Sequence, residues 1–382
     1  MTMETAKIAA GLLKNALRYR YLRRTGRPGR PQALSLEITH DCVARCVMCN
    51  IWKISHDVPN LTMDQWLSLL SSDLFMDIRE LDITGGEPFL RSDLVELFNG
   101  ICTLKHDHYA GLKSIAVTTN GLLPERVLPA VEAMMPIMQE QGLDLVVVCA
   151  LDAVSDLHDR IRNFPGAWPT VDRTIEALVG LRKSFPNLIV GVKTTILPLN
   201  VDELDGIARY AEARGLFTII SPCIITEGRY LNPDRAEDLA FDEQDLQKMI
   251  TFFSGDRFQW SFHGRSLVEY FETGSVSKPC SCGFNYFFVR SNGEVFLCPL
   301  INASVGNVTE TDVGDLFSSD RAGRIRKTIG RLPQCHSCTE PGLERYSLPF
   351  EGWHYLKMLW QTGGVKFMEM HRHMGLDKYF NI

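Results

Sequence analysis

The chain has 382 residues, of which 45% are hydrophobic and 23% are charged, and its net charge is −6. This composition excludes a disordered or fibrous protein and predicts a globular protein with one large domain and one or two smaller pieces. The sequence contains neither an apolar run of membrane-spanning length nor a leading apolar run with a small-residue cleavage site. We therefore expect the eleven cysteines to be reduced, in the cytoplasm, where clustered thiols bind metal more often than they form disulfides.

The first predicted element is a basic amphipathic helix within residues 1–33. Residues 1–30 carry eight basic groups and one acid, whereas the rest of the chain carries 32 basic and 45 acidic groups. Two apolar stripes recur at helical spacing, namely Ile8, Leu12 and Ala16, and beside them Leu13, Leu17 and Tyr21. Such a helix either packs on the domain with its basic face in solvent or contacts an anionic membrane through residues 1–25.

Residues 34–226 alternate short apolar runs with amphipathic segments. The predicted strands are Ser35–Thr39, Glu80–Thr84, Ser114–Thr119, Leu145–Leu151, Leu188–Ile196 and Phe217–Ile225. The predicted helices between them are Met63–Leu70, Asp93–Leu104, Leu123–Gln139, Val171–Phe185 and Asp202–Arg214. This α/β alternation predicts a partial (β/α)6 TIM-like barrel, in which functional groups follow the carboxyl ends of the strands.

A cysteine-rich loop follows the first predicted strand. Cys42, Cys46 and Cys49 form the pattern CxxxCxxC. Three closely spaced thiolates can each bind one iron of a cubane cluster, which leaves the fourth iron open to a small molecule. Zinc is the alternative metal, and the loop offers only His40 or His56 as a fourth ligand.

This pattern resembles the radical S-adenosylmethionine (AdoMet) superfamily. The resemblance implies a [4Fe-4S] cluster on the loop, with the open iron chelated by AdoMet. Thr84–Pro88 is similar to the family's GGE motif, which implies that Gly85, Gly86 and Glu87 lie at the amino group of the cofactor. Paired glycines allow close approach of the backbone, and a carboxylate suits an ammonium partner.

Three further segments resemble the same family, in particular its branch with a cysteine-rich C-terminal extension. Thr118–Gly121, Ala150–Ala153 and His158–Arg162 are similar to its TNG, SLDG and HDxxR segments. The resemblance implies that Asn120, Asp152 and Arg162 bind the cofactor, with a surface salt bridge as the alternative role. Ala150 and Ala153 replace the usual Ser and Gly, which weakens any expectation of a ribose contact at position 150. Periodicity does not decide whether Lys193 and Thr195, or their neighbours, face the cavity.

A second set of cysteines follows residues 227–274, which we expect to be connecting helices. The set comprises Cys280, Cys282, Cys298, Cys335 and Cys338, and Ser291–Gly293 predicts a β-hairpin within it. Residues 275–340 resemble the SPASM or twitch extension, which implies a small α+β domain with an auxiliary [4Fe-4S] cluster. No cysteine follows Cys338, so we expect one auxiliary cluster, bound by Cys298, Cys335, Cys338 and either Cys280 or Cys282. A zinc ribbon is the alternative.

Three isolated cysteines and the C-terminal tail carry less information. Cys102, Cys149 and Cys223 are predicted to be buried apolar residues, and access to the cavity is the alternative for Cys223. Residues 341–382, which include His371 and His373, are expected to form a helical tail that closes the barrel.

The resemblance implies a radical AdoMet oxidoreductase. Such an enzyme receives an electron from reduced flavodoxin or ferredoxin, cleaves AdoMet and abstracts a hydrogen atom from an unactivated carbon. An auxiliary cluster that accepts the remaining electron would give a net oxidation of a sugar, cyclitol or other small alcohol. The candidates for a substrate base are Glu227, Arg229, Tyr230, His263 and Tyr286, of which none stands out.

Other functions stay open at this point. Peptide-modifying relatives often carry an N-terminal leader-binding domain, and the 33 residues before the first strand are too few for one. The basic helix keeps a membrane lipid as a candidate substrate. A non-catalytic iron-sulfur or zinc protein that senses redox state or binds a partner is the alternative of another class. Nucleic acid is not expected as a partner.

Overall fold

A curved sheet of nine strands organises the computed structural model, which describes residues 3–258, 261–277 and 279–371. The strand order is β6-β5-β4-β3-β2-β1-β7-β8-β9. The first six strands pair in parallel, as βαβ connections require. Their bounds are β1 (Ala33–Glu37), β2 (Glu80–Thr84), β3 (Ser114–Thr119), β4 (Asp144–Ala150), β5 (Leu188–Ile196) and β6 (Phe217–Pro222). The predicted (β/α)6 barrel is confirmed.

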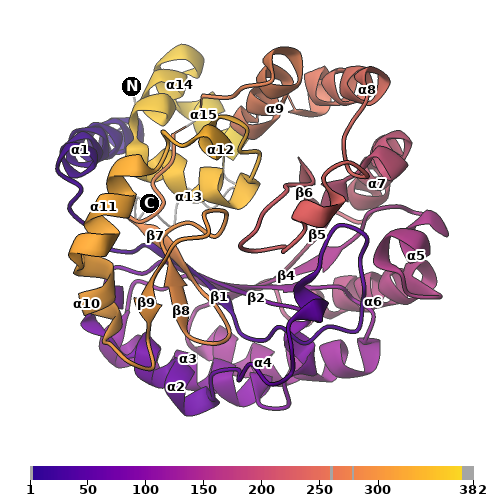
Figure 1. Cartoon of the computed structure of the whole chain (residues 1–382), viewed down its shortest axis with the longest axis horizontal. Helices are drawn as coiled ribbons and strands as arrows, with labels where there is room; N and C mark the ends of the chain where they lie inside the picture. Colours follow the sequence, from indigo (N-terminus) through magenta and orange to yellow (C-terminus); the bar gives the residue numbers. More distant parts are fainter. Residues whose placement is uncertain (1–2, 259–260, 278, 372–382) are drawn as a thin grey trace.

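Helices cover the outer face of this sheet (Figure 1). They are α2 (Met63–Leu70), α3 (Leu94–His108), α4 (Pro124–Glu140), α5 (Leu157–Arg162), α6 (Ala167–Leu181) and α7 (Leu204–Ala213). Helix α6 begins four residues before the predicted start because Asp159 accepts hydrogen bonds from the backbone N–H groups of Gly166 and Trp168 at 2.6 and 2.7 Å. Gly166 adopts a left-handed conformation there (φ 72°), which suits glycine.

The C-terminal hairpin extends the barrel sheet. Strand β7 (Tyr286–Val289) pairs in parallel with β1, and β8 (Glu294–Phe296) and β9 (Ser304–Asn307) add antiparallel strands. Buried residues of the hairpin share one apolar core with the barrel. Near the hairpin lie α10 (Val313–Ser318), α11 (Asp320–Thr328) and α12 (Pro333–His336). At the other end of the sheet, α8 (Glu243–Ser254) and α9 (Phe262–Thr273) share a core cluster with the ends of β5 and β6. Strand β1, which precedes the first cysteine loop, and strand β8, which precedes Cys298, therefore belong to one continuous sheet.

Helix α1 (Met3–Thr25) packs on the C-terminal helices α13 (Pro341–Glu351), α14 (Trp353–Thr362) and α15 (Gly364–His371). Ile8 and Leu12 are fully buried and share a core cluster with Tyr355 and Phe367. Gly352 allows this approach, because a side chain there would collide with the backbone of Leu12. Residues 372–382 of the predicted helical tail, including His373, lie outside the described residues. Among the helices that the structure describes, none combines the length and the apolar character that crossing a membrane requires.

Candidate cofactor and substrate site

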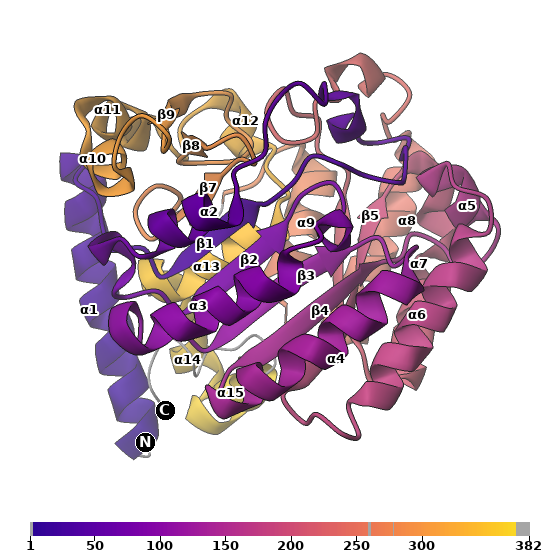
Figure 2. The same ribbon diagram turned by 90° about the horizontal axis from the view of Figure 1, so that it is seen from below.

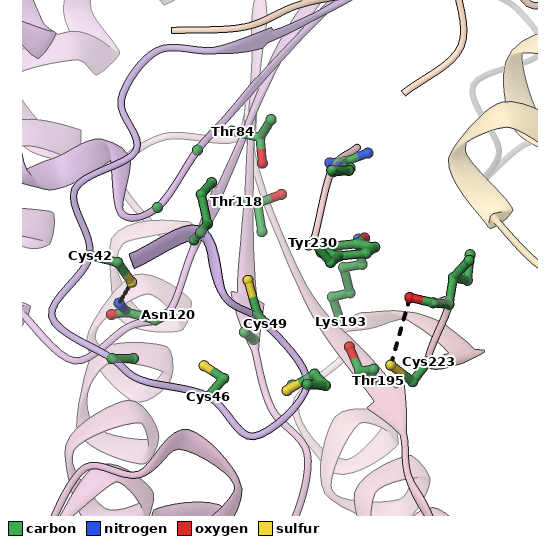
Figure 3. Close-up of a pocket in the computed structure, with 18 of the residues that line it drawn as sticks. Cys42, Cys46, Cys49, Thr84, Thr118, Asn120, Lys193, Thr195, Cys223 and Tyr230 are labelled. Carbon is green, nitrogen blue, oxygen red and sulfur yellow. Dashed lines mark hydrogen bonds between the residues drawn. The ribbon is translucent and has the colours of Figure 1, made fainter. Parts of the chain in front are cut away.

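A cavity lies at the carboxyl ends of the parallel strands (Figure 3). Cys42, Cys46 and Cys49 line one side of it, on the loop between β1 and α2. Backbone hydrogen bonds attach this loop to the barrel: Val47 N–H donates to the carbonyl of Ile161 at 2.9 Å, and Asn50 N–H donates to that of Tyr230 at 2.8 Å. The loop is therefore positioned by segments that follow β4 and β6.

Two of the three thiols, those of Cys42 and Cys46, have side-chain donors near their sulfur atoms. The Nδ2 atom of Asn120 lies 3.8 Å from Sγ of Cys42, and Nη1 of Arg162 lies 3.6 Å from Sγ of Cys46. Burial raises the pKa of the Cys42 and Cys49 thiols to about 12, and neighbouring thiols add to this effect. A bound metal reverses this preference because it stabilises thiolates directly. Three thiols on one loop, two of them beside N–H donors, fit an iron-sulfur cluster with an open iron.

Gly85 and Gly86 make room for the cysteine loop. A side chain at Gly85 would collide with the backbone of Thr39, and one at Gly86 with that of Asp41. Both glycines line the cavity. The backbone at both glycines thus closely approaches the start of the cysteine loop. Both glycines also lie where AdoMet is expected to bind.

Glu87 is fully buried and is absent from the cavity lining. Its carboxylate accepts hydrogen bonds from Thr119 Oγ1 at 2.9 Å and from the Asn120 backbone N–H at 2.7 Å. Burial raises its pKa from 4.5 to about 7. The carboxylate is thus engaged by the turn after β3, and a contact between Glu87 and the cofactor ammonium stays a prediction. Asn120 does line the cavity.

Asp152 and Arg162 form a buried ion pair, with Asp152 Oδ2 2.6 Å from Arg162 Nη2. Asp152 also accepts from the Thr195 N–H at 2.9 Å and is fully buried outside the cavity lining, whereas Arg162 lines the cavity. Asp152 therefore orients Arg162 and does not itself face the cofactor space. The pair is internal, so the alternative of a surface salt bridge is wrong.

The wall opposite the cysteine loop is polar and charged. Lys193 and Thr195 line it from β5, together with Arg229, Tyr230 and Glu340. Burial by itself lowers the pKa of Arg229. Tyr230, Glu340 and Tyr286 outweigh this effect and raise the pKa above the ordinary arginine value. Figure 3 shows Tyr230, Lys193 and Thr195 opposite Cys49.

Three polar residues of the cavity escaped the sequence reasoning. Glu37 lies on β1 with its Oε1 3.5 Å from Arg290 Nε. Ser221 ends β6, and its Oγ lies 2.9 Å from Nε2 of His263. Glu340 precedes α13. Of the three, Glu37 had a sequence signal, because a carboxylate inside an apolar strand is unusual. The positions of Ser221 and Glu340 at the cavity depend on tertiary contacts, which the local sequence does not reveal.

The five candidate bases separate in the structure. Arg229 and Tyr230 line the cavity, and His263 reaches it through Ser221. Glu227 is exposed and lies outside the lining. Tyr286 also lies outside it because its ring stacks on Tyr346, with centroids 4.8 Å apart.

The C-terminal cysteines come together from separate segments. Cys282 is 1% exposed, and its thiol contacts those of Cys280 and Cys298. Burial raises the pKa of Cys335, at α12, and the nearby Cys280 and Cys298 raise it further. Cys338 is partly buried and packs against the main core. Both Cys280 and Cys282 therefore lie within the set.

The isolated cysteines divide differently from the prediction. Cys102 and Cys149 are buried, at 1% and 0% exposure. Cys223 is only partly buried and lines the cavity, because it follows β6 at the carboxyl edge of the sheet. All eleven cysteines are free of disulfides.

Known proteins resemble this chain over most of its length. The SkfB maturation protein for the sporulation killing factor of Bacillus subtilis is 22% identical over 313 residues, which cover 79% of this chain and 70% of SkfB. An AdoMet-dependent heme synthase of Methanosarcina barkeri is 24% identical over 308 residues, which cover 76% of this chain and 82% of the synthase. The SuiB structure from Streptococcus suis shares the fold, with a TM-score of 0.58 and 17% identity over 91% of this chain and 78% of SuiB.

Two family models match the chain. The radical SAM superfamily model matches residues 36–211, and the SPASM iron-sulfur cluster-binding domain model matches residues 280–339. The first match covers the barrel up to helix α7, including the first cysteine loop, and the second covers the hairpin region with the second cysteine set. They confirm AdoMet and iron-sulfur clusters as cofactors. The chain therefore belongs to the radical SAM superfamily and carries a C-terminal SPASM domain.

Proposed function

We propose that this radical SAM enzyme oxidises a small polar substrate, such as a sugar, a cyclitol or another alcohol. The observation that carries the proposal is the cavity, which has the cluster cysteines on one side and Lys193, Arg229 and Glu340 on the other. A substrate with hydroxyl groups matches this polar wall, because buried charged groups require hydrogen-bonding partners. When bound, the cofactors supply a carbon radical that removes a hydrogen atom and an auxiliary cluster that accepts an electron.

Removal of the hydroxyl proton requires a base on the chain. Ser221 faces the cavity and contacts His263, and its Oγ also lies 3.3 Å from the carbonyl oxygen of Thr339. We propose that Ser221 accepts the substrate hydroxyl proton while its own proton passes to His263, the final acceptor. We further propose that the guanidinium of Arg162, held by Asp152, attracts the cofactor carboxylate.

The electron acceptor lies behind the same wall. A side chain at Gly228 would come within 3.0 Å of the carbonyl oxygen of Pro299, the residue after Cys298. Gly228 also accepts a hydrogen bond from Arg290. The segment that carries Arg229 thus touches the segment that carries a cluster cysteine. We propose one auxiliary [4Fe-4S] cluster, in agreement with five cysteines in this set, and reduced flavodoxin or ferredoxin as the electron donor to the first cluster.

Anaerobic reduction of the reconstituted protein with AdoMet tests the enzymatic class. We expect 5′-deoxyadenosine and methionine in the wild type and neither in Cys46→Ala, with Cys102→Ala as the matched control that retains both. Two clusters predict about eight irons per chain and no stoichiometric zinc. Absence of both products in the fully loaded wild type would favour the non-catalytic iron-sulfur protein.

Modification of a peptide is the second candidate, and a specific observation favours it. SkfB is a maturation protein, and SuiB has been seen bound to its precursor peptide SuiA. The polar wall of the cavity is compatible with a peptide side chain as well as with a free alcohol. Deuterium transfer into 5′-deoxyadenosine from labelled small alcohols, but not from labelled peptides, would support the first candidate; the opposite result would support the second.

A further inference from the structure

Helix α1 presents an apolar stripe to solvent on the side opposite its packed face. Leu13, Leu17 and Tyr21 are 46%, 61% and 52% exposed. They recur every fourth residue, so they lie on one face over three consecutive turns. The packing of α1 on α13 and α14 uses Ile8 and Leu12 instead. Attachment of the helix to the domain therefore does not explain the exposed stripe.

The C-terminal helices continue this apolar surface. Trp353 and Trp360 on α14 are 45% and 89% exposed, and Val365 on α15 is 66% exposed. The guanidinium of Arg20 lies 5.2 Å from the ring centre of Trp353, which connects the two helices. Gly352 contacts Leu12 and Gly364 contacts Thr5, so α14 runs antiparallel to α1. Figure 2 shows α14 and α15 beside α1.

Basic side chains surround the apolar stripe. The exposed bases of α1 are Lys7, Lys14, Arg18, Arg20 and Arg24. Residues 1–30 contain a single acid, Glu4. We call this surface the basic apolar face, defined by the five bases together with Leu13, Leu17, Tyr21, Trp353 and Trp360. Exposed tryptophan, leucine and lysine or arginine on one face are typical of helices that lie in a membrane interface.

We propose that the basic apolar face binds the surface of a bilayer that contains anionic phospholipids. The charge of the face favours this partner over a second copy of the chain, because two copies would bring like charges together. The exposed tryptophans and leucines favour a bilayer over a nucleic acid, which offers phosphates but no apolar layer for Leu17 and Trp360. The proposal does not rest on the identity of the substrate, since the face lies outside the cavity.

Vesicle co-sedimentation of the full, cluster-loaded chain tests the proposal. We expect sedimentation with vesicles that contain phosphatidylglycerol and much less with pure phosphatidylcholine, and we expect added salt to weaken it. Replacing two surface bases, in Arg20→Gln/Arg24→Gln, is expected to weaken binding by about 30-fold. Leu17→Ser/Trp360→Ser is expected to weaken it by at least about 10-fold through lost apolar insertion.

Matched controls keep the test independent of folding and catalysis. Met76 and Leu199 are 53% and 48% exposed and lie outside the face, so Met76→Ser/Leu199→Ser is expected to leave vesicle binding unchanged. Iron content and AdoMet cleavage should be equal in all variants. Equal binding to neutral and anionic vesicles, or equal losses in face and control variants, would overturn the proposal. So would a lipid-free dimer that Leu17→Ser separates, because the face would then join two copies.

Discussion

The two cysteine regions of the molecule achieve metal binding in different ways. Cys42, Cys46 and Cys49 lie on one loop that follows β1, and all three line the cavity. The C-terminal set is assembled from segments around the hairpin and from the turn at α12, with Cys282 and Cys298 buried. Local spacing thus determines the first set, whereas tertiary folding determines the second. The first region opens onto the cavity, whereas the second combines the buried Cys282 and Cys298 with the partly exposed Cys280, Cys335 and Cys338 outside the cavity lining.

The comparison predicts that loss of one loop cysteine removes activity with little loss of stability. Cys42→Ala should lower the rate of AdoMet cleavage by at least about 1,000-fold, because one of the three thiolates that bind the first cluster is lost. The thermal midpoint of the cluster-free protein should change little, since Cys42 is only partly buried. Product assays and thermal unfolding check the two results. A large drop in thermal midpoint would show that the loop also stabilises the barrel.

The buried pair behind the loop should have a large effect on stability. Asp152→Asn leaves the Arg162 guanidinium without its charge partner in a buried position, a change that typically costs about 3 kcal/mol. Chemical denaturation of the cluster-free protein measures it, with the exposed pair variant Asp202→Asn as control. Equal effects of the two variants would contradict a supporting role for Asp152. Because Arg162 contacts Cys46, iron retention should fall as well.

Loss of an auxiliary cysteine should lower stability and leave AdoMet cleavage largely intact, which is the reverse of the result expected for Cys42→Ala. Cys298→Ala should remove about four of eight irons and lower the stability of the loaded protein by about 2 kcal/mol, because the cluster joins separate segments. AdoMet cleavage without substrate should stay within a few-fold of wild type. Cys149→Ala, which changes a buried thiol outside both sets, should lose no iron. If Cys298→Ala abolishes cleavage, the two regions are not independent.

Sequence reasoning located the barrel well because its signals are local. The predicted bounds of β2, β3, β5 and α2 coincide with the structure. It failed where a residue's role depends on distant partners. The hydrogen bond between the Glu87 carboxylate and Thr119, in the turn after β3, could not be read from the sequence. The pairing of β7 with β1 was also beyond its reach, because no local pattern encodes which strand a C-terminal hairpin joins.

Glu87 provides the finest test, since it links the turns after β2 and β3 beside the cysteine loop. Its pKa is raised by burial to about 7, so the folded state holds the proton more tightly than the unfolded chain does. The stability from this group is therefore fully present below about pH 4.5 and is lost as the pH rises through about 7. Between pH 5 and pH 8 the cluster-free wild type should lose about 2 kcal/mol more than Glu87→Gln. Chemical denaturation at each pH measures the two free energies of unfolding, and the exposed control Glu140→Gln should follow the wild type across the range. If Glu87→Gln also follows the wild type, the Glu87 carboxylate does not titrate in the folded protein.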